Sequence, residues 1–253
     1  MATAPALLQP GELARIAPSR ASAYFLDVDG TLLDIMPRPE DVSADSELRE
    51  FLAMLARETN GALALISGRA IDGIDQIFAP LVLPAAGLHG AEIRFPDGSR
   101  RCAPGGVMDH VRPLVTLFVA SRPGLRLEDK GAALALHFRQ APDLAREVLD
   151  FLQPLAWARG LAVQQGKMVA ELKEAAHDKG KAIAAFMTIP PFTGRRPVFI
   201  GDDLTDESGF TYVNSQGGIS VRTGPAATAT QARYGLCNPS EVRAELQRLL
   251  TAC

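Results

Sequence analysis

Two aspartates, Asp27 and Asp29, stand at the end of an apolar run in the segment YFLDVDGTLLD, residues 24–34. The apolar run predicts a buried strand. Ionised carboxylates are rarely buried unless a partner charge or a cation lies beside them. A strand that ends in two acids therefore needs compensation, and we expect a cationic group at this place.

Taken alone, the D-x-D-G pattern also fits an ordinary turn, because Asp and Gly both favour turns. A calcium-binding EF-hand loop is excluded, since it needs Gly at position 6 and Glu at position 12. Counted from Asp27, Gly30 stands at position 4 and Arg38 at position 12. A P-loop is excluded too, because neither GLAVQQGKM nor DKGKAI has the G-x-x-x-x-G-K-[ST] spacing.

The elements that must position these acids follow a strand, helix, strand pattern. YFLDV predicts a strand, DSELREFLAMLARETNG predicts a helix that ends at Gly61, and ALALIS predicts the next strand. One face of the helix carries Leu48, Phe51, Leu52 and Leu55. Such a unit forms a parallel sheet that is covered on both faces, so its strands are continuous apolar runs.

The same pattern resumes in the last third of the chain. KGKAIAAFM predicts a helix, RPVFIGDD a third strand that ends in acids, and GGISVRTG a fourth strand. In open α/β sheets the ligand binds beyond the carboxyl ends of the strands. The sequence therefore predicts that the residues at these ends converge on one crevice: Asp27, Asp29, Ser67, Asp202 and Asp203.

The middle of the chain, residues 104–175, has a different pattern. A helix is expected over Val107–Ala120, and in LRLEDKGAALALHFRQ the residues Leu134, Leu136 and Phe138 alternate with Ala135, His137 and Arg139. A second helix, DLAREVLDFLQPLAWAR, precedes LAVQQGKMVAELK. There Lys167, Glu171 and Lys173 share one face and Met168, Ala170 and Leu172 share the other. This αββαββ order predicts an inserted cap domain that acts as a lid.

We therefore expect an α/β fold with two domains. Residues 1–21 form an N-terminal segment, residues 22–103 and 176–253 form a catalytic core, and residues 104–175 form the inserted cap. The chain of 253 residues, 47% of them hydrophobic, has room for a sizeable core.

Composition excludes several classes of protein. A net charge of −3 and a pI near 5.8 argue against a nucleic-acid partner. No apolar run approaches the roughly 20 residues of a membrane span, and the N-terminus lacks a signal sequence, so no membrane partner and a cytoplasmic location are expected. Cys102, Cys237 and Cys253 form no CxxC motif, which argues against disulfides and structural zinc. The four histidines lack the spacing of a zinc helix.

Four motifs occur in a fixed order: DVDGTL, LISGR, the lysine of DKG, and GDDLTDE. In this order they resemble the phosphatases of the haloacid dehalogenase superfamily, which have a Rossmann-like core. GLHGAE, GKMVAELK, AIAAFM and VFIGDDLTDESGF are similar to the bacterial trehalose-6-phosphate phosphatases in particular. The resemblance extends from Tyr24 to about Arg222 and includes the cap.

This resemblance implies catalytic roles. Asp27 is the nucleophile that forms an aspartyl-phosphate, and Asp29 is the general acid that protonates the leaving sugar oxygen and later deprotonates water. Ser67 and Lys179 hold the phosphoryl oxygens. A surface lysine at a helix start is the alternative for Lys179.

The resemblance also implies Mg²⁺ as the cofactor. Its expected ligands are Asp27, the backbone carbonyl of Asp29, and Asp202, with Asp203 and Asp206 as supporting residues. Spacing does not settle which of the three later acids contacts the metal.

For the sugar, the resemblance implies contacts from charged residues of the cap: Glu128, Lys130, Arg139, Lys167 and Glu171. A solvated sheet face is the alternative. Gly30, Arg69 and His89 are expected near the phosphate and the mouth of the site, although Arg69 and His89 also fit as braces of a loop. The chain departs from the family at Lys173 and Glu174, where Arg-Pro is frequent.

The expected function is therefore hydrolysis of trehalose 6-phosphate to trehalose and phosphate, with functional coupling to a trehalose-6-phosphate synthase. A related phosphatase for sucrose or mannosyl-glycerate phosphates is the nearest alternative. An inactive regulatory domain of the same fold is another, but such domains lose one or more of the acids. Asp27, Asp29, Ser67, Lys179 and Asp202 are all present.

Overall fold

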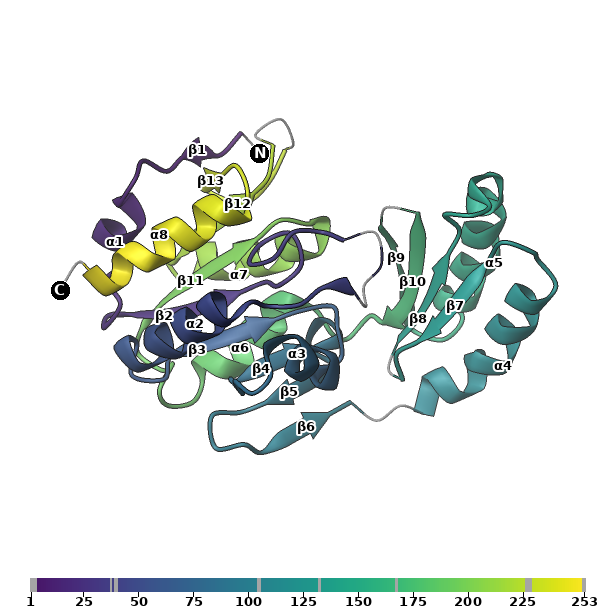
Figure 1. The fold of residues 1–253 in the computed structure, drawn as a ribbon. Coiled ribbons are helices and arrows are strands. Elements are labelled where there is room, and N and C mark those ends of the chain that lie inside the picture. Colours follow the sequence, from purple (N-terminus) through teal and green to yellow (C-terminus); the bar gives the residue numbers. More distant parts are fainter. Residues whose placement is uncertain are drawn as a thin grey trace. The chain divides into compact units, whose positions relative to one another are not determined.

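The computed structural model describes residues 4–36, 38, 41–103, 106–131, 133–166, 168–225 and 229–251. The chain forms two compact units (Figure 1). The core unit comprises Met1–Arg101 and Asp178–Cys253, and the cap unit comprises Cys102–His177. Each unit has its own hydrophobic core.

A nine-stranded sheet crosses the described part of the core unit. Its order is β1 (Ala6–Leu7), β13 (Tyr234–Leu236), β12 (Ile219–Thr223), β11 (Arg196–Gly201), β2 (Ser22–Leu26), β3 (Leu63–Ile66), β4 (Ala85–Gly87), β5 (Glu92–Arg94) and β6 (Arg100–Cys102). Neighbouring strands from β1 through to β4 are parallel, and β5 is antiparallel to β4. The predicted parallel α/β sheet is confirmed.

Helices cover both faces of this sheet (Figure 1). One face packs against α1 (Glu12–Ile16), α2 (Ser46–Glu58), α3 (Ile71–Phe78) and α8 (Pro239–Thr251). The other packs against α6 (Lys179–Met187) and α7 (Glu207–Ser215). Short 3₁₀ turns span Leu88–Gly90, Pro142–Leu144 and Leu204–Asp206.

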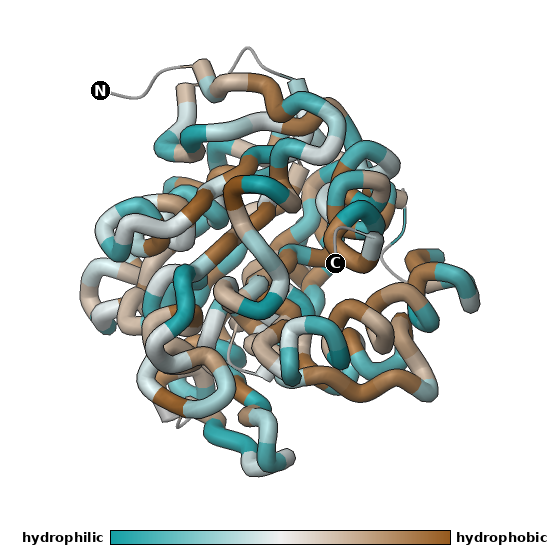
Figure 2. Tube along the Cα trace, turned by 90° about the vertical axis from the view of Figure 1, so that its left-hand side faces the viewer, coloured by the Kyte–Doolittle hydropathy of each residue, from teal (hydrophilic) through white to brown (hydrophobic). Residues whose placement is uncertain are grey.

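Strand β2 shows why the apolar runs are continuous. Tyr24 and Leu26 belong to the cluster under α2 and α8, whereas Ala23 and Phe25 belong to the cluster under α6. Successive side chains point to opposite faces, so a strand covered on both sides must be apolar at every position. In Figure 2, brown, hydrophobic stretches and teal, hydrophilic stretches follow one another along the chain.

The order of the strands reverses at β2. The chain passes from β2 to β3 on one side, and β11 lies on the other side. The N–H of Asp27 donates to the carbonyl of Ile200 at 2.9 Å, which fixes the ends of β2 and β11 together. Such a switch point opens a crevice at the carboxyl ends of the strands, where ligands of open α/β sheets bind.

The cap unit has the predicted αββαββ order. Helix α4 (Gly106–Ala120) precedes β7 (Arg126–Asp129) and β8 (Ala133–His137), and α5 (Ala145–Trp157) precedes β9 (Leu161–Gly166) and β10 (Val169–Glu174). The four strands form an antiparallel sheet in the order β7-β8-β10-β9. Leu134, Leu136 and Leu172 pack with residues of both helices, so one face of this sheet is covered by α4 and α5.

None of the described helices is both long enough and apolar enough to cross a bilayer.

Candidate active site

Four segments of the core unit meet at the carboxyl ends of the central strands. Asp27 directly follows β2, Ser67 follows β3, Asp202 follows β11, and Lys179 is the first residue of α6. Asp178 caps this helix by accepting from the N–H of Lys181 at 2.8 Å. This N-cap hydrogen bond of Asp178 fixes the point at which α6 begins and therefore the position of Lys179.

Lys179 joins two acids. Its Nζ lies 2.7 Å from Oδ1 of Asp27 and 2.5 Å from Oδ1 of Asp206, and all three side chains are at most 5% exposed. Burial alone would lower the pKa of Lys179, but the carboxylates of Asp206 and Asp27 raise it above the ordinary value, so the ammonium stays charged. The alternative of a solvated surface lysine is therefore wrong.

Asp206 shapes the loop after β11. Its Oδ2 accepts from the N–H groups of Asp202 and Asp203, both at 2.9 Å, and its Oδ1 accepts from Lys179. Gly201 is required beside it, because a Cβ there would lie 2.4 Å from Cγ of Asp206. Both oxygens of this fully buried carboxylate are engaged, so Asp206 holds Asp202 and Lys179 in place.

Asp203 is the outermost of the three later acids. Its side chain is exposed and accepts from the N–H of Thr205 at 3.3 Å, which caps the short turn Leu204–Asp206. This contact supports the loop and keeps the carboxylate at the surface.

The carboxyls of Asp27 and Asp202 are both protonated more readily than ordinary aspartates. Burial raises the pKa of Asp27 well above its usual range; Lys179 opposes this shift, while Asp206 and Asp202 add to it. Burial, followed by the charge of Asp206, raises the pKa of Asp202 to about 7. The site therefore holds more negative charge than one lysine can balance.

The donor set fits a divalent cation. Oxygen atoms of Asp27, Asp202 and Asp206 all lie within 4.8 Å of one another. Both oxygens of Asp206 accept hydrogen bonds, and those of Asp27 accept from Lys179 and, at 3.3 Å, from Oγ1 of Thr31. Oδ1 of Asp202 is buried and has no hydrogen-bond partner within the described part of the chain. Hard cations such as Mg²⁺ and Ca²⁺ prefer oxygen ligands of this kind.

Gly30 permits the close approach of the D-x-D-G loop to Asp202. Its φ is +82°, and a Cβ at this position would lie 2.1 Å from Oδ2 of Asp202. A larger residue would therefore meet both backbone strain and a steric clash. The glycine of the motif serves the geometry of the acidic cluster.

Asp29 is held by Arg69. Nε of Arg69 lies 2.7 Å from Oδ2 of Asp29, and Nη2 lies 2.7 Å from Oδ1. The side chains are 20% and 33% exposed for Arg69 and Asp29, respectively. The sequence placed Arg69 near the mouth of the site, but it gave no signal for this bidentate pair.

Ser67 directly follows β3, and His89 lies in the 3₁₀ turn Leu88–Gly90 that follows β4. Ser67 is buried, and its Oγ accepts from the N–H of Arg69 at 3.1 Å. His89 has a φ of +56°, and its N–H donates to the carbonyl of Ser67 at 3.1 Å. A Cβ on Gly68 would lie 2.8 Å from Cε1 of His89, so the imidazole packs closely against this turn.

On the cap sheet, two of the predicted sugar contacts, Glu128 and Glu171, share a row. Glu128, Ala135 and Glu171 lie directly opposite one another on β7, β8 and β10, on the face away from α4 and α5. Nζ of Lys130 lies 2.9 Å from Oε2 of Glu171. The small, buried Ala135 thus has an acid on each side, and Glu171 is buried too.

Two further residues on this face of the cap sheet were not predicted as site residues. Gln164 lies directly opposite Glu171 on β9, and only the register of β9 and β10 reveals it. Nε2 of His137 lies 2.8 Å from Oε2 of Glu128, and this hydrogen bond lowers the pKa of Glu128. The alternation of β8 gave a signal for His137, since it shares a face with Ala135.

The remaining predicted sugar contacts are Arg139 and Lys167. Arg139 is exposed and follows the end of β8. Lys167 lies outside the described residues.

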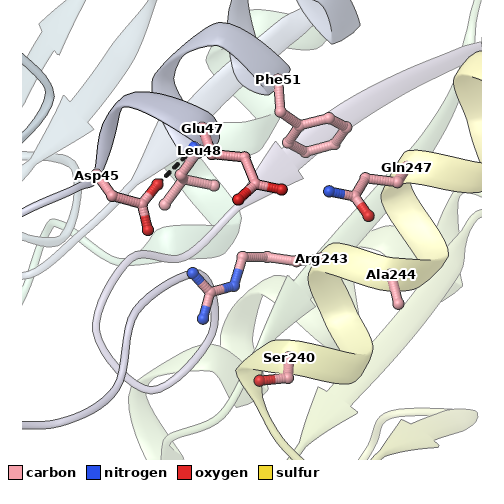
Figure 3. Close-up of a pocket in the computed structure, with 8 residues that line it drawn as sticks. All are labelled: Asp45, Glu47, Leu48, Phe51, Ser240, Arg243, Ala244 and Gln247. Atoms are coloured by element: carbon pink, nitrogen blue, oxygen red, sulfur yellow. Dashed lines mark hydrogen bonds between the residues drawn. The ribbon is translucent and has the colours of Figure 1, made fainter.

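A cavity of about 170 Å³ lies between α2 and α8 in the core unit (Figure 3). It is lined by Asp45, Glu47, Leu48, Phe51, Ser240, Arg243, Ala244 and Gln247. The carboxylate of Asp45 accepts from the N–H of Leu48 at 2.7 Å and so caps α2. None of the lining residues belongs to the acidic cluster.

The raised pKa values predict how the stability of the metal-free protein depends on pH. A folded carboxyl that keeps its proton up to about pH 7, against an ordinary pKa of 3.8, makes the folded state bind more protons than the unfolded state in between. The stabilisation of the folded state by this extra proton is fully present below the ordinary pKa and is lost as the pH rises toward 7.

Asp202→Asn lacks this titration. We therefore expect its free energy of unfolding, relative to that of the parent, to increase by about 2 kcal/mol as the pH rises from 5 to 8. Denaturant unfolding in the presence of a chelator measures this difference. Asp203→Asn, which alters an exposed neighbour, is the matched control. Parallel stability curves for the parent and Asp202→Asn would contradict the prediction.

Comparison with known proteins agrees with this geometry. Residues 25–240 match the protein family described as Trehalose-phosphatase. A probable trehalose-phosphate phosphatase of Sinorhizobium fredii is 45% identical over 213 residues, which cover 83% of this chain and 80% of that protein. A trehalose-6-phosphate phosphatase of Escherichia coli is 43% identical over 234 residues, or 91% of this chain and 87% of that protein.

The fold is also similar to a solved structure. The C-terminal domain of trehalose-6-phosphate phosphatase from Candida albicans has a TM-score of 0.85 at 22% identity, with 99% of each chain covered. At that identity the likeness concerns the fold, whereas the family match and the bacterial relatives concern the sequence. The chain belongs to the trehalose-phosphatase family of phosphoric monoester hydrolases.

Proposed function

We propose that this protein hydrolyses trehalose 6-phosphate to trehalose and inorganic phosphate, with Mg²⁺ as its cofactor and a phosphorylated Asp27 as its intermediate. The observation that carries the proposal is the buried carboxylate of Asp27, held by Lys179 beside the unpartnered oxygen of Asp202. The names of the bacterial relatives support the substrate, since one is a trehalose-6-phosphate phosphatase and another a probable trehalose-phosphate phosphatase. The reaction places the protein in trehalose biosynthesis, after a synthase that makes the phosphorylated sugar.

In the first step, an oxygen of Asp27 attacks phosphorus and the bond from phosphorus to the sugar oxygen breaks. The sugar oxygen takes a proton from Asp29 and leaves as a hydroxyl. The ammonium of Lys179, 2.7 Å from Asp27, keeps the attacking carboxylate in one orientation and offsets the charge of the phosphoryl group. Splitting the displacement in two lowers the barrier of each part.

In the second step, water attacks the phosphorus of the aspartyl-phosphate. Asp29 takes a proton from that water, the bond from phosphorus to Asp27 breaks, and phosphate leaves. Asp27 is then a carboxylate again and Asp29 carries the proton for the next cycle. The hydroxyl of Ser67 and the ammonium of Lys179 hold phosphoryl oxygens during both steps.

The side chains of Asp27 and Asp202 would hold the Mg²⁺, together with the backbone carbonyl of Asp29. Bound there, the ion supplies positive charge that allows a dianionic phosphate to approach a cluster of acids. The unpartnered buried oxygen of Asp202 supports this role, because a buried acceptor without a donor is otherwise costly.

The polar row of the cap sheet is proposed to bind the sugar. Glu128, Glu171 and Lys130 carry charged acceptors and donors that match sugar hydroxyls, with His137 and Gln164 beside them. Contacts of this kind, far from phosphorus, position the phosphate for attack and so lower the barrier.

Release of phosphate from a panel of sugar phosphates tests the proposal. With Mg²⁺ present, we expect trehalose 6-phosphate to have the highest kcat/KM, above sucrose and mannosyl-glycerate phosphates. Chelation should abolish the activity and added Mg²⁺ should restore it. Asp27→Asn should lower kcat by about 10³-fold or more. A preference for another sugar would overturn the substrate, and full activity under chelation would overturn the metal.

Glu171→Ala tests the role of the cap sheet. The loss of a charged hydrogen bond to the sugar should lower kcat/KM for trehalose 6-phosphate by about ten- to a hundredfold. Hydrolysis of an aryl phosphate, which has no sugar hydroxyls, should stay nearly unchanged. Steady-state kinetics on both substrates measures the contrast.

Asp150→Ala is the control for Glu171→Ala, because Asp150 is exposed on α5 and therefore on the helical side of the cap. We expect parental kinetics on both substrates. If Glu171→Ala lost activity equally on both substrates, its role would lie in folding or in the core chemistry. If it lost none, this face of the sheet would be merely solvated.

A further inference from the structure

The two acids on either side of Ala135 in the cap sheet have different partners. Oε2 of Glu128 lies 2.8 Å from Nε2 of His137. Oε2 of Glu171 lies 2.9 Å from Nζ of Lys130. No described residue donates to Oε1 of Glu128, and 34% of this side chain is exposed. One oxygen of Glu128 is therefore held in place, while the other remains available as an acceptor.

His137 reaches Glu128 diagonally across β7 and β8. Glu128 lies directly opposite Ala135, and His137 lies two residues further along β8 on the same face, opposite Arg126. Diagonal neighbours of an antiparallel pair are about 7–8 Å apart, which two long side chains can span. The contact therefore turns the carboxylate of Glu128 toward Arg126 and away from Lys130, which lies at the other end of β7.

Lys130 is a competing partner for Glu128. The hydrogen bond from His137 is the largest cause that lowers the pKa of Glu128; burial opposes it, and the charge of Lys130 lowers the pKa further. Lys130 therefore acts on Glu128 electrostatically although its ammonium is paired with Glu171. Without His137, Glu128 would be drawn toward this ammonium and would compete with Glu171 for it.

The hydrogen shared by the pair belongs to His137. A carboxyl with a pKa below its ordinary value is ionised in neutral solution, and an ionised carboxylate only accepts hydrogen bonds. Nε2 of His137 must therefore be the donor. The open Oε1 of Glu128 is then a charged acceptor, which suits a hydroxyl of a sugar and repels a phosphate.

We propose that His137 is a positioning residue that fixes Glu128 so that its Oε1 meets a hydroxyl of the sugar. The inference rests on the proposed function, because it assumes that this face of the cap sheet binds the sugar. His137 acts through Glu128 and needs no contact of its own with the substrate. Its loss should therefore affect substrates that carry sugar hydroxyls and leave the chemistry at phosphorus unchanged.

Kinetics on trehalose 6-phosphate and on p-nitrophenyl phosphate tests the proposal. His137→Gln places an amide N–H near the position of Nε2, whereas His137→Asn places it near Nδ1, out of reach of Glu128. We expect His137→Asn to lower kcat/KM for trehalose 6-phosphate by about tenfold, the lower end of the range for a lost charged hydrogen bond, because the carboxylate remains. His137→Gln should recover most of this loss, and both variants should hydrolyse the aryl phosphate at the parental rate.

A double-mutant cycle shows whether His137 acts through Glu128. Glu128→Ala should lower kcat/KM for trehalose 6-phosphate by about ten- to a hundredfold. In that background His137→Asn should cost less than about twofold, because the residue through which His137 acts is gone. His110→Ala is the matched control, since His110 is exposed on α4, and it should have parental kinetics. Denaturant unfolding of each variant detects a loss of stability, and the comparison of Gln with Asn holds at equal stability.

Equal losses on both substrates, additive losses in the cycle, or equal kinetics of His137→Gln and His137→Asn would overturn the proposal. Full activity of Glu128→Ala would overturn it together with the proposed sugar site. The parent enzyme separates these failures from a failure of the proposed function. If the parent hydrolyses trehalose 6-phosphate and Glu128→Ala is impaired while the cycle is additive, only the role of His137 falls.

Discussion

The ammonium of Lys179 lies between two buried carboxylates that arrive from different parts of the chain. It contacts Asp27 at the end of β2 and Asp206 in the loop after β11, and none of the three side chains is more than 5% exposed. Removal of one member of a buried ion pair leaves an uncompensated charge and typically costs about 3–5 kcal/mol. The start of α6, the ends of two strands and the loop that carries Asp202 therefore all depend on this one contact. Asp206 links the lysine to the loop after β11, because its second oxygen accepts hydrogen bonds from the backbone N–H groups of Asp202 and Asp203.

The charge that remains after this pairing determines what the site can bind. Three acids surround one lysine, and burial raises the pKa values of Asp27 and Asp202. A cluster of this kind would repel a phosphate monoester unless a cation joined it. The proposed nucleophile Asp27 is part of this acidic cluster, and the proposed Mg²⁺ would supply the positive charge that lets a phosphate approach it. The proposed sugar contacts belong to a separate unit, whose sheet buries leucines on one face and carries Lys130 and Glu171 as an ion pair.

Sequence periodicity predicted the parts of this structure that depend on burial. Continuous apolar runs identified β2, β3, β11 and β12, and alternation identified the cap hairpins. Convergence of Asp27 and Asp202 follows from the parallel topology, in which strand ends share one edge. The pair between Arg69 and Asp29 could not be predicted, because it depends on rotamers in two loops. Gln164 depends on strand register, and β1 and β13 are only two and three residues long, too short for a periodic signal.

Chemical trapping of the intermediate tests the central claim, that Asp27 takes the phosphoryl group. The enzyme is mixed with trehalose 6-phosphate and Mg²⁺, quenched in acid during turnover and treated with borohydride, which reduces an acyl phosphate to an alcohol. Mass spectrometry of the peptide that contains residues 24–34 then locates the product. We predict homoserine at position 27, with Asp29 and Asp202 unchanged. An unmodified Asp27 in an enzyme that is turning over, or reduction at another carboxyl, would contradict the account.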